Sequence, residues 1–127
     1  MPTALVIDDS VASRTLLRGI LKKLGISVVV AADGGAGLTE LGANGSGIDL
    51  VLLDWHMEPM DGPAFLHHLR DNPLTVRLPV IMITAEADRK AVADIAQLGV
   101  QGYIIKPFDR QMVAARVAAL GITAAGS

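Results

Sequence analysis

The stretch Ala4-Leu5-Val6-Ile7-Asp8-Asp9 decides the fold, because a short apolar run ends abruptly in two carboxylates. Its apolar residues do not alternate with polar ones, which is typical of a strand buried on both faces. Strands of that kind belong to parallel sheets that helices cover on both sides. Recurrence of the pattern along the chain therefore predicts an α/β protein.

Four further runs rich in β-branched residues repeat the pattern, at Val28–Ala31, Leu50–Leu53, Val80–Ile83 and Tyr103–Ile105. Segments with helical spacing lie between and after these runs, and several end at a glycine, the common helix stop. Their apolar positions are Leu16, Leu17, Ile20, Leu21 and Leu24 before Gly25; Phe65, Leu66 and Leu69 after Pro63; Val92, Ile95 and Leu98 before Gly99; and Val113, Val117 and Leu120 before Gly121. Five alternations of strand and helix predict a doubly wound α/β fold with a parallel sheet.

The second helix is the weakest element of this prediction. Residues 34–47 contain six glycines, and each interior glycine costs a helix about 1 kcal/mol relative to alanine. We therefore expect this helix to be short, frayed and mobile.

The composition of the chain excludes several classes of function. A chain of 127 residues, 51% hydrophobic, accommodates one domain, which we expect over residues 1–121 with a flexible tail at 122–127. The net charge of −2, without long runs of one sign, argues against nucleic acid or an anionic membrane as partner. The absence of cysteine excludes thiol catalysis and Cys-ligated metals. No apolar stretch approaches the roughly 18 residues of a membrane helix, and no signal-peptide pattern precedes the acidic pair, so we expect a cytoplasmic protein that acts through binding.

Charged and polar residues follow the predicted strands. Asp8 and Asp9 end the first strand, Asp54 the third, Thr84 the fourth and Lys106 the fifth. Parallel strands bring these ends to one edge of the sheet, where ligands of open α/β sheets bind. Close carboxylates repel each other by about 4 kcal/mol at 4 Å and an effective dielectric near 20. A divalent cation together with Lys106 balances three carboxylates, and oxygen ligands favour Mg²⁺, with Mn²⁺ as substitute.

Magnesium sites of this kind commonly also bind a phosphoryl group. An aspartate can attack such a group and form an acyl phosphate in one in-line displacement. Asp54 is the best candidate for the nucleophile, because the consecutive Asp8 and Asp9 look like a metal-holding pair. Lys106 and Thr84 would share the charge on the phosphoryl oxygens.

These residues resemble the response-regulator receiver domain over about residues 4–120. The matching motifs are Asp8-Asp9, Asp54 with Met57 and Met60-Asp61-Gly62, Thr84-Ala85, and Lys106-Pro107-Phe108. Two stretches look like the single-domain chemotaxis type, the CheY-like group: Thr84-Ala85-Glu86-Ala87 and Gly102-Tyr103-Ile104-Ile105-Lys106-Pro107-Phe108. The resemblance implies a flavodoxin-like (βα)5 fold with strand order 2-1-3-4-5 and a cis bond before Pro107.

The resemblance also implies how the site works. Asp54 would accept a phosphoryl group from a sensor histidine kinase, a histidine phosphotransfer protein or acetyl phosphate. Asp9, Asp54 and the main-chain carbonyl of His56 would ligate Mg²⁺, with Asp8 acting through water. Thr84 would move toward the phosphoryl group and Tyr103 would change rotamer. The face formed by the fourth helix, fifth strand and fifth helix would then change its affinity for a protein target, in a monomer or a weak phosphorylation-dependent dimer.

One departure concerns the loop after Asp54. The family usually has proline directly after the methionine that aligns with Met57, whereas this chain has Glu58 there and Pro59 one place later. Glu58, held extended by the proline, adds a carboxylate that could contact the metal or Lys106, or be solvated. His56 and Glu86 could tune hydrolysis, or be exposed loop residues. The single tryptophan, Trp55, neighbours Asp54 and should report Mg²⁺ by fluorescence.

Other function classes stay open. A phosphatase with an aspartyl nucleophile typically has Asp-x-Asp after the first strand, but the position two beyond Asp8 is Ser10. A flavodoxin-like electron carrier would use Ser10, Ser13 and Thr15 as a poor phosphate loop and would be yellow. A receiver-like module that signals without phosphate conflicts with the complete set of site residues. We expect a binding switch with slow self-dephosphorylation and not an enzyme.

Overall fold

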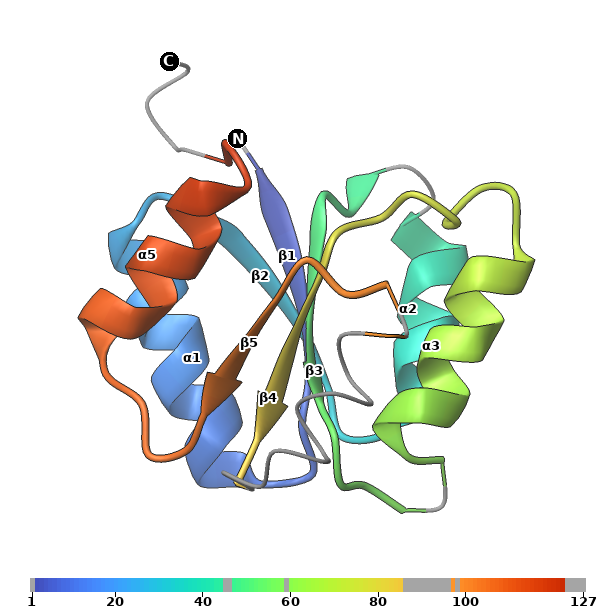
Figure 1. The fold of residues 1–127 in the computed structure, drawn as a ribbon, viewed down its shortest axis with the longest axis horizontal. Coiled ribbons are helices and arrows are strands. Elements are labelled where there is room, and N and C mark those ends of the chain that lie inside the picture. Colours follow the sequence, from blue (N-terminus) through green and yellow to red (C-terminus); the bar gives the residue numbers. More distant parts are fainter. Residues whose placement is uncertain (1, 45–46, 59, 86–96, 98, 123–127) are drawn as a thin grey trace.

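A five-stranded parallel sheet forms the centre of the computed structural model, which describes residues 2–44, 47–58, 60–85, 97 and 99–122 (Figure 1). The strand order is β2-β1-β3-β4-β5, which confirms the predicted fold class and strand order. All neighbouring strands pair in parallel. The strands are β1 (Thr3–Ile7), β2 (Ser27–Ala31), β3 (Leu50–Asp54), β4 (Val80–Thr84) and β5 (Gly102–Ile105).

Helices cover both faces of this sheet. Helices α1 (Val11–Lys23) and α5 (Arg110–Ala119) lie on one side, and α2 (Gly34–Asn44) and α3 (Gly62–Asp71) on the other (Figure 1). The helix predicted around Val92, Ile95 and Leu98 lies outside the described residues. Because all strands run the same way, their carboxyl ends share the edge drawn at the bottom of Figure 1.

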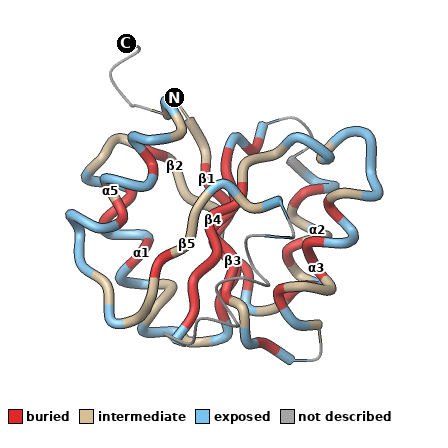
Figure 2. Tube along the Cα trace, viewed as in Figure 1, coloured by how far each residue is buried: buried red, intermediate tan, exposed pale blue. Residues whose placement is uncertain are grey.

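The core consists of two apolar clusters separated by the sheet. Alternate residues of β1 belong to the two clusters. Leu5 and Ile7 lie in the cluster under α2 and α3, while Ala4 and Val6 lie in the cluster under α1 and α5. The central strands are buried along nearly their whole length (Figure 2). The prediction of burial on both faces is wrong for the two edge strands, where only Ala31 of β2 and Ile104 of β5 are buried. An edge strand lacks a neighbour on one side, so its side chains are less completely covered.

Helix α2 spans 11 residues, one more than α3 or α5, so the expectation of a short helix is wrong. A Cβ atom on Gly37 would lie 2.5 Å from Ile7 Cδ1 and 3.1 Å from Phe65 Cε2. The glycine therefore lets the helix approach the sheet and α3 more closely than any other residue would allow. This close packing offsets the low helix propensity on which the expectation of a short helix was based.

The ends of the helices follow ordinary capping chemistry. Ser10, Asp61 and Asp109 cap the first turns of α1, α3 and α5 through side-chain oxygens. Gly25 and Gly121 follow α1 and α5 with positive φ, as the helix-stop pattern predicts. Ile122 still packs against the core, one residue beyond the expected boundary at 121, and residues 123–127 lie outside the described part. Among the described residues, no helix has the length and hydrophobicity that crossing a membrane requires.

Candidate functional site

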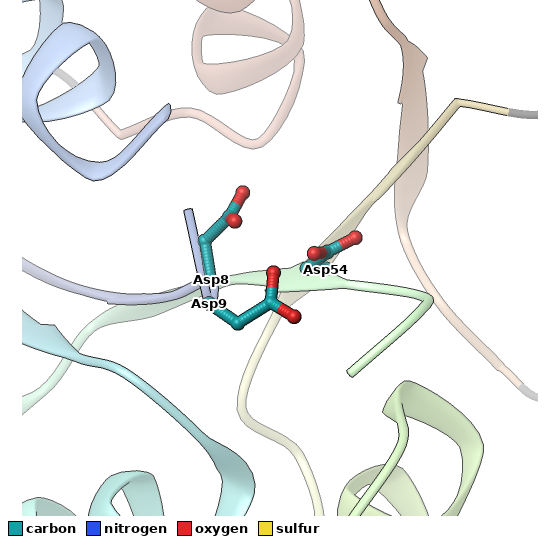
Figure 3. A group of neighbouring side chains, drawn as sticks. All are labelled: Asp8, Asp9 and Asp54. Atoms are coloured by element: carbon teal, nitrogen blue, oxygen red, sulfur yellow. The ribbon is translucent and has the colours of Figure 1, made fainter. Parts of the chain in front are cut away.

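Three carboxylates meet at the carboxyl edge of the sheet (Figure 3). Asp8 and Asp9 follow β1, and Asp54 ends the adjacent strand β3. One oxygen from each carboxylate lies within 4.8 Å of the others. Asp8 and Asp54 are only 1% and 5% exposed, whereas Asp9 is exposed. The structure thus brings together the three acidic residues that the strand-end pattern singled out.

Asp8 is fixed by its main chain and by one side-chain oxygen. Its backbone N–H donates to Ala31 O at 3.1 Å, and the N–H of Ser10 donates to Asp8 Oδ1 at 2.8 Å. The guanidinium of Arg14 donates to the Asp8 carbonyl at 2.7 Å. The second side-chain oxygen, Oδ2, is buried and accepts no hydrogen bond from the described residues. The Lys106 ammonium lies 3.3 Å from this oxygen as an ion-pair partner. A carboxylate oxygen has two lone pairs, so Oδ2 can still accept a further ligand.

Lys106 provides the positive charge. It follows β5, and its Nζ lies 3.3 Å from Asp8 Oδ2 and 3.9 Å from Asp54 Oδ2. Its backbone N–H donates to the carbonyl of Thr84 at 2.7 Å, which ties the end of β5 to the end of β4. The Lys106–Pro107 peptide bond is cis. One lysine among three carboxylates leaves the cluster with an excess of negative charge.

The surroundings of Asp54 make it a weaker acid than an exposed aspartate. Burial and the neighbouring Asp8 charge raise the pKa of the Asp54 carboxyl from 3.8 to about 6, and Asp9 adds to the rise. Lys106 acts in the opposite direction, as does the His56 N–H, which donates to Asp54 Oδ1 at 3.3 Å. Repulsion and desolvation therefore outweigh the local attraction, and the site favours an additional cation.

The donor set fits a hard divalent cation. The ligand atoms that Asp8, Asp9 and Asp54 offer are all carboxylate oxygens, which suit Mg²⁺ better than metals that prefer nitrogen or sulfur. The excess negative charge of the three carboxylates, which the ion pairs of Lys106 offset only in part, points to the same conclusion. Asp8, Asp9 and Asp54 would supply the oxygen ligands of a cation held there.

The two predicted switch residues lie on the neighbouring strands β4 and β5. Thr84 is fully buried at the end of β4, one position past Ile83, which pairs with Asp54. Tyr103 is half-buried on β5, and the guanidinium carbon of Arg116 lies 5.6 Å from its ring centroid. The structure therefore places Thr84 next to the acidic cluster and Tyr103 on the adjoining edge strand.

The loop after Asp54 forms an open polar pocket at the mouth of the cluster. The exposed His56 and Glu58 line this pocket with Met57, Asp9 and Asp61. The ion pairs of Lys106 within the described residues go to Asp8 and Asp54 and do not include Glu58, which lines the pocket. Glu86, the other predicted tuning residue, lies outside the described residues.

Two contacts of the site were not predicted from the sequence. Arg14 lies inside α1, and nothing in its spacing indicated that it reaches the Asp8 carbonyl. Gly62 was part of a quoted motif, but its reason is visible only in three dimensions: a Cβ there would lie 2.8 Å from the Asp54 carbonyl oxygen and 2.9 Å from Trp55 Cα. Such contacts between distant segments leave no periodic signal in a single sequence.

Comparison with known proteins agrees with this geometry. The model of the response regulator receiver domain matches residues 4–118. The chain is 34% identical over 113 residues to chemotaxis protein CheY of Pseudomonas aeruginosa, covering 89% of this chain and 90% of the relative. It is 38% identical over 104 residues to chemotaxis protein CheY-3 of Vibrio cholerae, covering 82% and 79%.

Solved structures give the same result. CheY of Borrelia burgdorferi, solved in a complex with CheX, BeF3 and Mg²⁺, matches with a TM-score of 0.88 and 31% identity, covering 96% of this chain and 90% of that one. CheY4 of Vibrio cholerae matches with a TM-score of 0.86 and 26% identity, covering 94% and 98%. The chain therefore belongs to the response regulator receiver domain family and is a receiver domain of the CheY-like type.

Proposed function

We propose that Asp54 accepts a phosphoryl group from a histidine kinase or a histidine phosphotransfer protein, in a Mg²⁺-dependent step, and that this modification changes the binding of a protein target. The observation that carries the proposal is that Asp54 lies 3.9 Å from the Lys106 ammonium and within 4.8 Å of the other two carboxylates. Asp54 thus has both a cation and a set of oxygen ligands close by, which is what a phosphoryl acceptor requires.

The transfer needs an ionised acceptor. With a pKa of about 6, Asp54 is mainly a carboxylate at neutral pH, and bound cations would lower its pKa further. One of its oxygens attacks the phosphorus of a phosphohistidine, a phosphorus–oxygen bond forms, and the phosphorus–nitrogen bond breaks with its electron pair leaving on the imidazole. Lys106 stabilises the negative charge on the transferred oxygens.

Asp9, Asp54 and the main-chain carbonyl of His56 would hold the metal, with Asp8 acting through water. When bound, Mg²⁺ supplies positive charge to the phosphoryl oxygens and offsets the repulsion among the carboxylates. The role of this chain is to keep the three carboxylates together without it, through the bonds that fix Asp8 and through the lysine.

Access to the acceptor supports a protein donor. A groove lined by Ala12, Ser13, Leu16, Lys106, Pro107 and Phe108 adjoins the site, and Lys106 belongs to both. Val11 and Leu16, on the first two turns of α1, are 67% and 50% exposed. An apolar surface next to the acceptor suits a helix that carries the donor histidine.

The output would travel through β4 and β5. The Thr84 hydroxyl would hydrogen-bond the phosphoryl group, and Thr84 is already joined to Lys106 through the main chain. Tyr103 and Arg116 line a second groove with Ile104, Ile105, Met112 and Ala115. A rotamer change of Tyr103 would reshape this groove, which we assign to the protein target. The solved complex of a related CheY with CheX supports a protein partner, and the names of several relatives favour a role in chemotaxis.

Intact-mass measurement after incubation with Mg²⁺ and acetyl phosphate tests the proposal. We expect one added phosphoryl group on the wild type and none on Asp54→Asn or in the presence of a chelator. The Asp49→Asn variant, which changes an exposed aspartate at the opposite edge of the sheet, should be labelled like the wild type. Equal labelling of the wild type and Asp54→Asn would overturn the assignment of Asp54.

A further inference from the structure

We propose that Arg14 is a positioning residue of the metal site, which orients the peptide unit between Asp8 and Asp9 so that both side chains face the cation. The inference rests on the proposed function, because it concerns how the chain prepares that same site. It assigns a specific task to a residue of α1 that touches neither the acceptor nor the lysine.

The Asp8 carbonyl receives no hydrogen bond from the helices or the sheet of the described residues. Asp8 lies between the last residue of β1 and the first residue of α1. Its carbonyl accepts from no backbone N–H of the described residues. The half-buried Arg14 donates to it from Nη1 at 2.7 Å. A charged donor at this distance makes a strong hydrogen bond, so the guanidinium takes the place of the missing backbone donor.

The hydrogen bond from Arg14 constrains the orientation of the Asp9 side chain more than that of the Asp8 side chain. The Asp8 side chain has its own restraint in the Ser10 N–H. The carboxylate of the exposed Asp9 forms no hydrogen bond with the described residues, so its direction depends on the backbone to which it is attached. The Asp8 carbonyl and the Asp9 N–H share one rigid peptide plane. Fixing the carbonyl therefore fixes the starting point of the Asp9 side chain.

Arg14 itself is well anchored for this task. Its backbone N–H donates to the carbonyl of Ser10 at 3.0 Å, and Ser10 caps the helix through Ser13. The arginine thus connects the first turns of α1 back to the end of β1. Outer residues that orient metal ligands in this way typically contribute about 10- to 100-fold to metal affinity.

A simple charge effect predicts the opposite sign. The guanidinium is a cation near three carboxylates, and a nearby cation repels Mg²⁺. If Arg14 acted only through its charge, its removal would strengthen Mg²⁺ binding. If it acts by positioning, its removal weakens Mg²⁺ binding despite the gain in net negative charge. The direction of the change therefore separates the two roles.

Titration calorimetry with MgCl₂ on Arg14→Met, Arg14→Lys and Arg18→Met makes this test. We expect about tenfold weaker Mg²⁺ binding by Arg14→Met and an intermediate loss by Arg14→Lys, which keeps the charge but lacks the planar fork. Arg18 is exposed one turn further along α1, so Arg18→Met is the matched control and should bind like the wild type. If Arg14→Met does not fold, a weakened Arg14→Lys supports the proposal and an unchanged one overturns it.

A readout without metal tests the hydrogen bond directly. The amide ¹⁵N resonance of Asp9 shares its peptide unit with the Asp8 carbonyl and should shift in Arg14→Met but not in Arg18→Met. Unchanged or stronger Mg²⁺ binding by Arg14→Met, while the wild type binds Mg²⁺, would overturn the role of Arg14 alone. Failure of the wild type to bind Mg²⁺ would overturn the proposed function as well.

Discussion

At the amino-terminal edge of the sheet the guanidinium of Arg70 donates to three main-chain carbonyls, whereas at the carboxyl edge three carboxylates cluster beside the Lys106 ammonium. The acceptors of Arg70 are Val76, Leu78 and Gly99. Nearby, the Gln101 side chain accepts from the N–H of Val80 at 2.8 Å. One edge satisfies its polar groups with protein atoms, and the other keeps like charges together.

The difference shows that the amino-terminal edge stabilises the fold, whereas the carboxyl edge forms the candidate functional site. Hydrogen bonds from a charged donor to main-chain carbonyls stabilise the fold, and Arg70 joins α3 to the turns before β4 and β5. Three clustered carboxylates destabilise the fold unless a ligand relieves their repulsion. Functional sites commonly carry such a stability cost. Substitutions at the amino-terminal edge should therefore lower stability, whereas removal of charge at the carboxyl edge should raise it.

The largest loss is expected from Arg70→Met at the amino-terminal edge. The variant removes three hydrogen bonds from a charged donor, one of them part-buried, which should lower the free energy of unfolding by about 2–3 kcal/mol. Arg77→Met, which changes an exposed arginine in the same loop, should alter it by less than about 0.5 kcal/mol. Urea denaturation measures both. Mg²⁺ affinity should stay at the wild-type value, and a loss of affinity in Arg70→Met would contradict the separation of the two edges.

The pH dependence of stability isolates the repulsion at Asp54. Its pKa is raised in the folded state, so protonation favours folding, and this contribution is lost as the pH rises from 3.8 through about 6. Wild type should therefore lose roughly 2–3 kcal/mol relative to Asp54→Asn over that range in the absence of Mg²⁺. Urea denaturation of both proteins at a series of pH values gives this difference. A difference that does not change with pH would show that Asp54 is not perturbed.

Gly62→Ala tests the close packing beneath the site. The added methyl group would lie 2.8 Å from the Asp54 carbonyl oxygen, so the backbone must move. We expect a loss of about 2 kcal/mol in the free energy of unfolding, together with weaker Mg²⁺ binding. Gly19→Ala in α1, where nothing lies within 4 Å of the new Cβ, should instead gain about 1 kcal/mol. Equal effects at both glycines would contradict the packing argument.

The smallest effect concerns the fluorescence of Trp55, which should change on addition of Mg²⁺ without a change in fold. The indole is half-buried, and its main chain is held by Ile83 and Gly62 on either side of the site. Fluorescence titrations of the wild type and of Asp54→Asn with Mg²⁺ make the comparison, and the variant should not respond. A spectrum unaffected by saturating Mg²⁺ would count against a cation next to Asp54.

Much of the fold could be predicted because the burial of each strand leaves a local run of apolar residues in the sequence. The apolar runs located all five strands to within one residue at each end, since a strand buried on both faces must be continuously apolar. The length of α2 could not be predicted, because the contacts of Gly37 with Ile7 and Phe65 join distant segments. Incomplete burial of β2 and β5 depends on strand order, which apolar runs alone do not encode.

The acidic cluster could be predicted for a similar reason. Parallel strands necessarily bring Asp8, Asp54 and Lys106 to one edge, so the strand ends sufficed to group them. The contacts of Arg14 and Arg70 could not be predicted, because each guanidinium reaches a main-chain carbonyl. Every residue carries such a carbonyl, so its position in the sequence provides no signal. The roles of His56, Glu58 and Glu86 stay predictions.

The most direct test of the contrast between the two edges is the thermal unfolding of wild type and Asp54→Asn at neutral pH, each with and without saturating Mg²⁺. Without Mg²⁺ the variant should have the higher Tm, because it lacks one of the repelling charges. With Mg²⁺ the wild type should gain more than the variant, since only it retains all three carboxylates. A lower Tm for the variant without Mg²⁺, together with an equal gain for both proteins on adding Mg²⁺, would contradict the account.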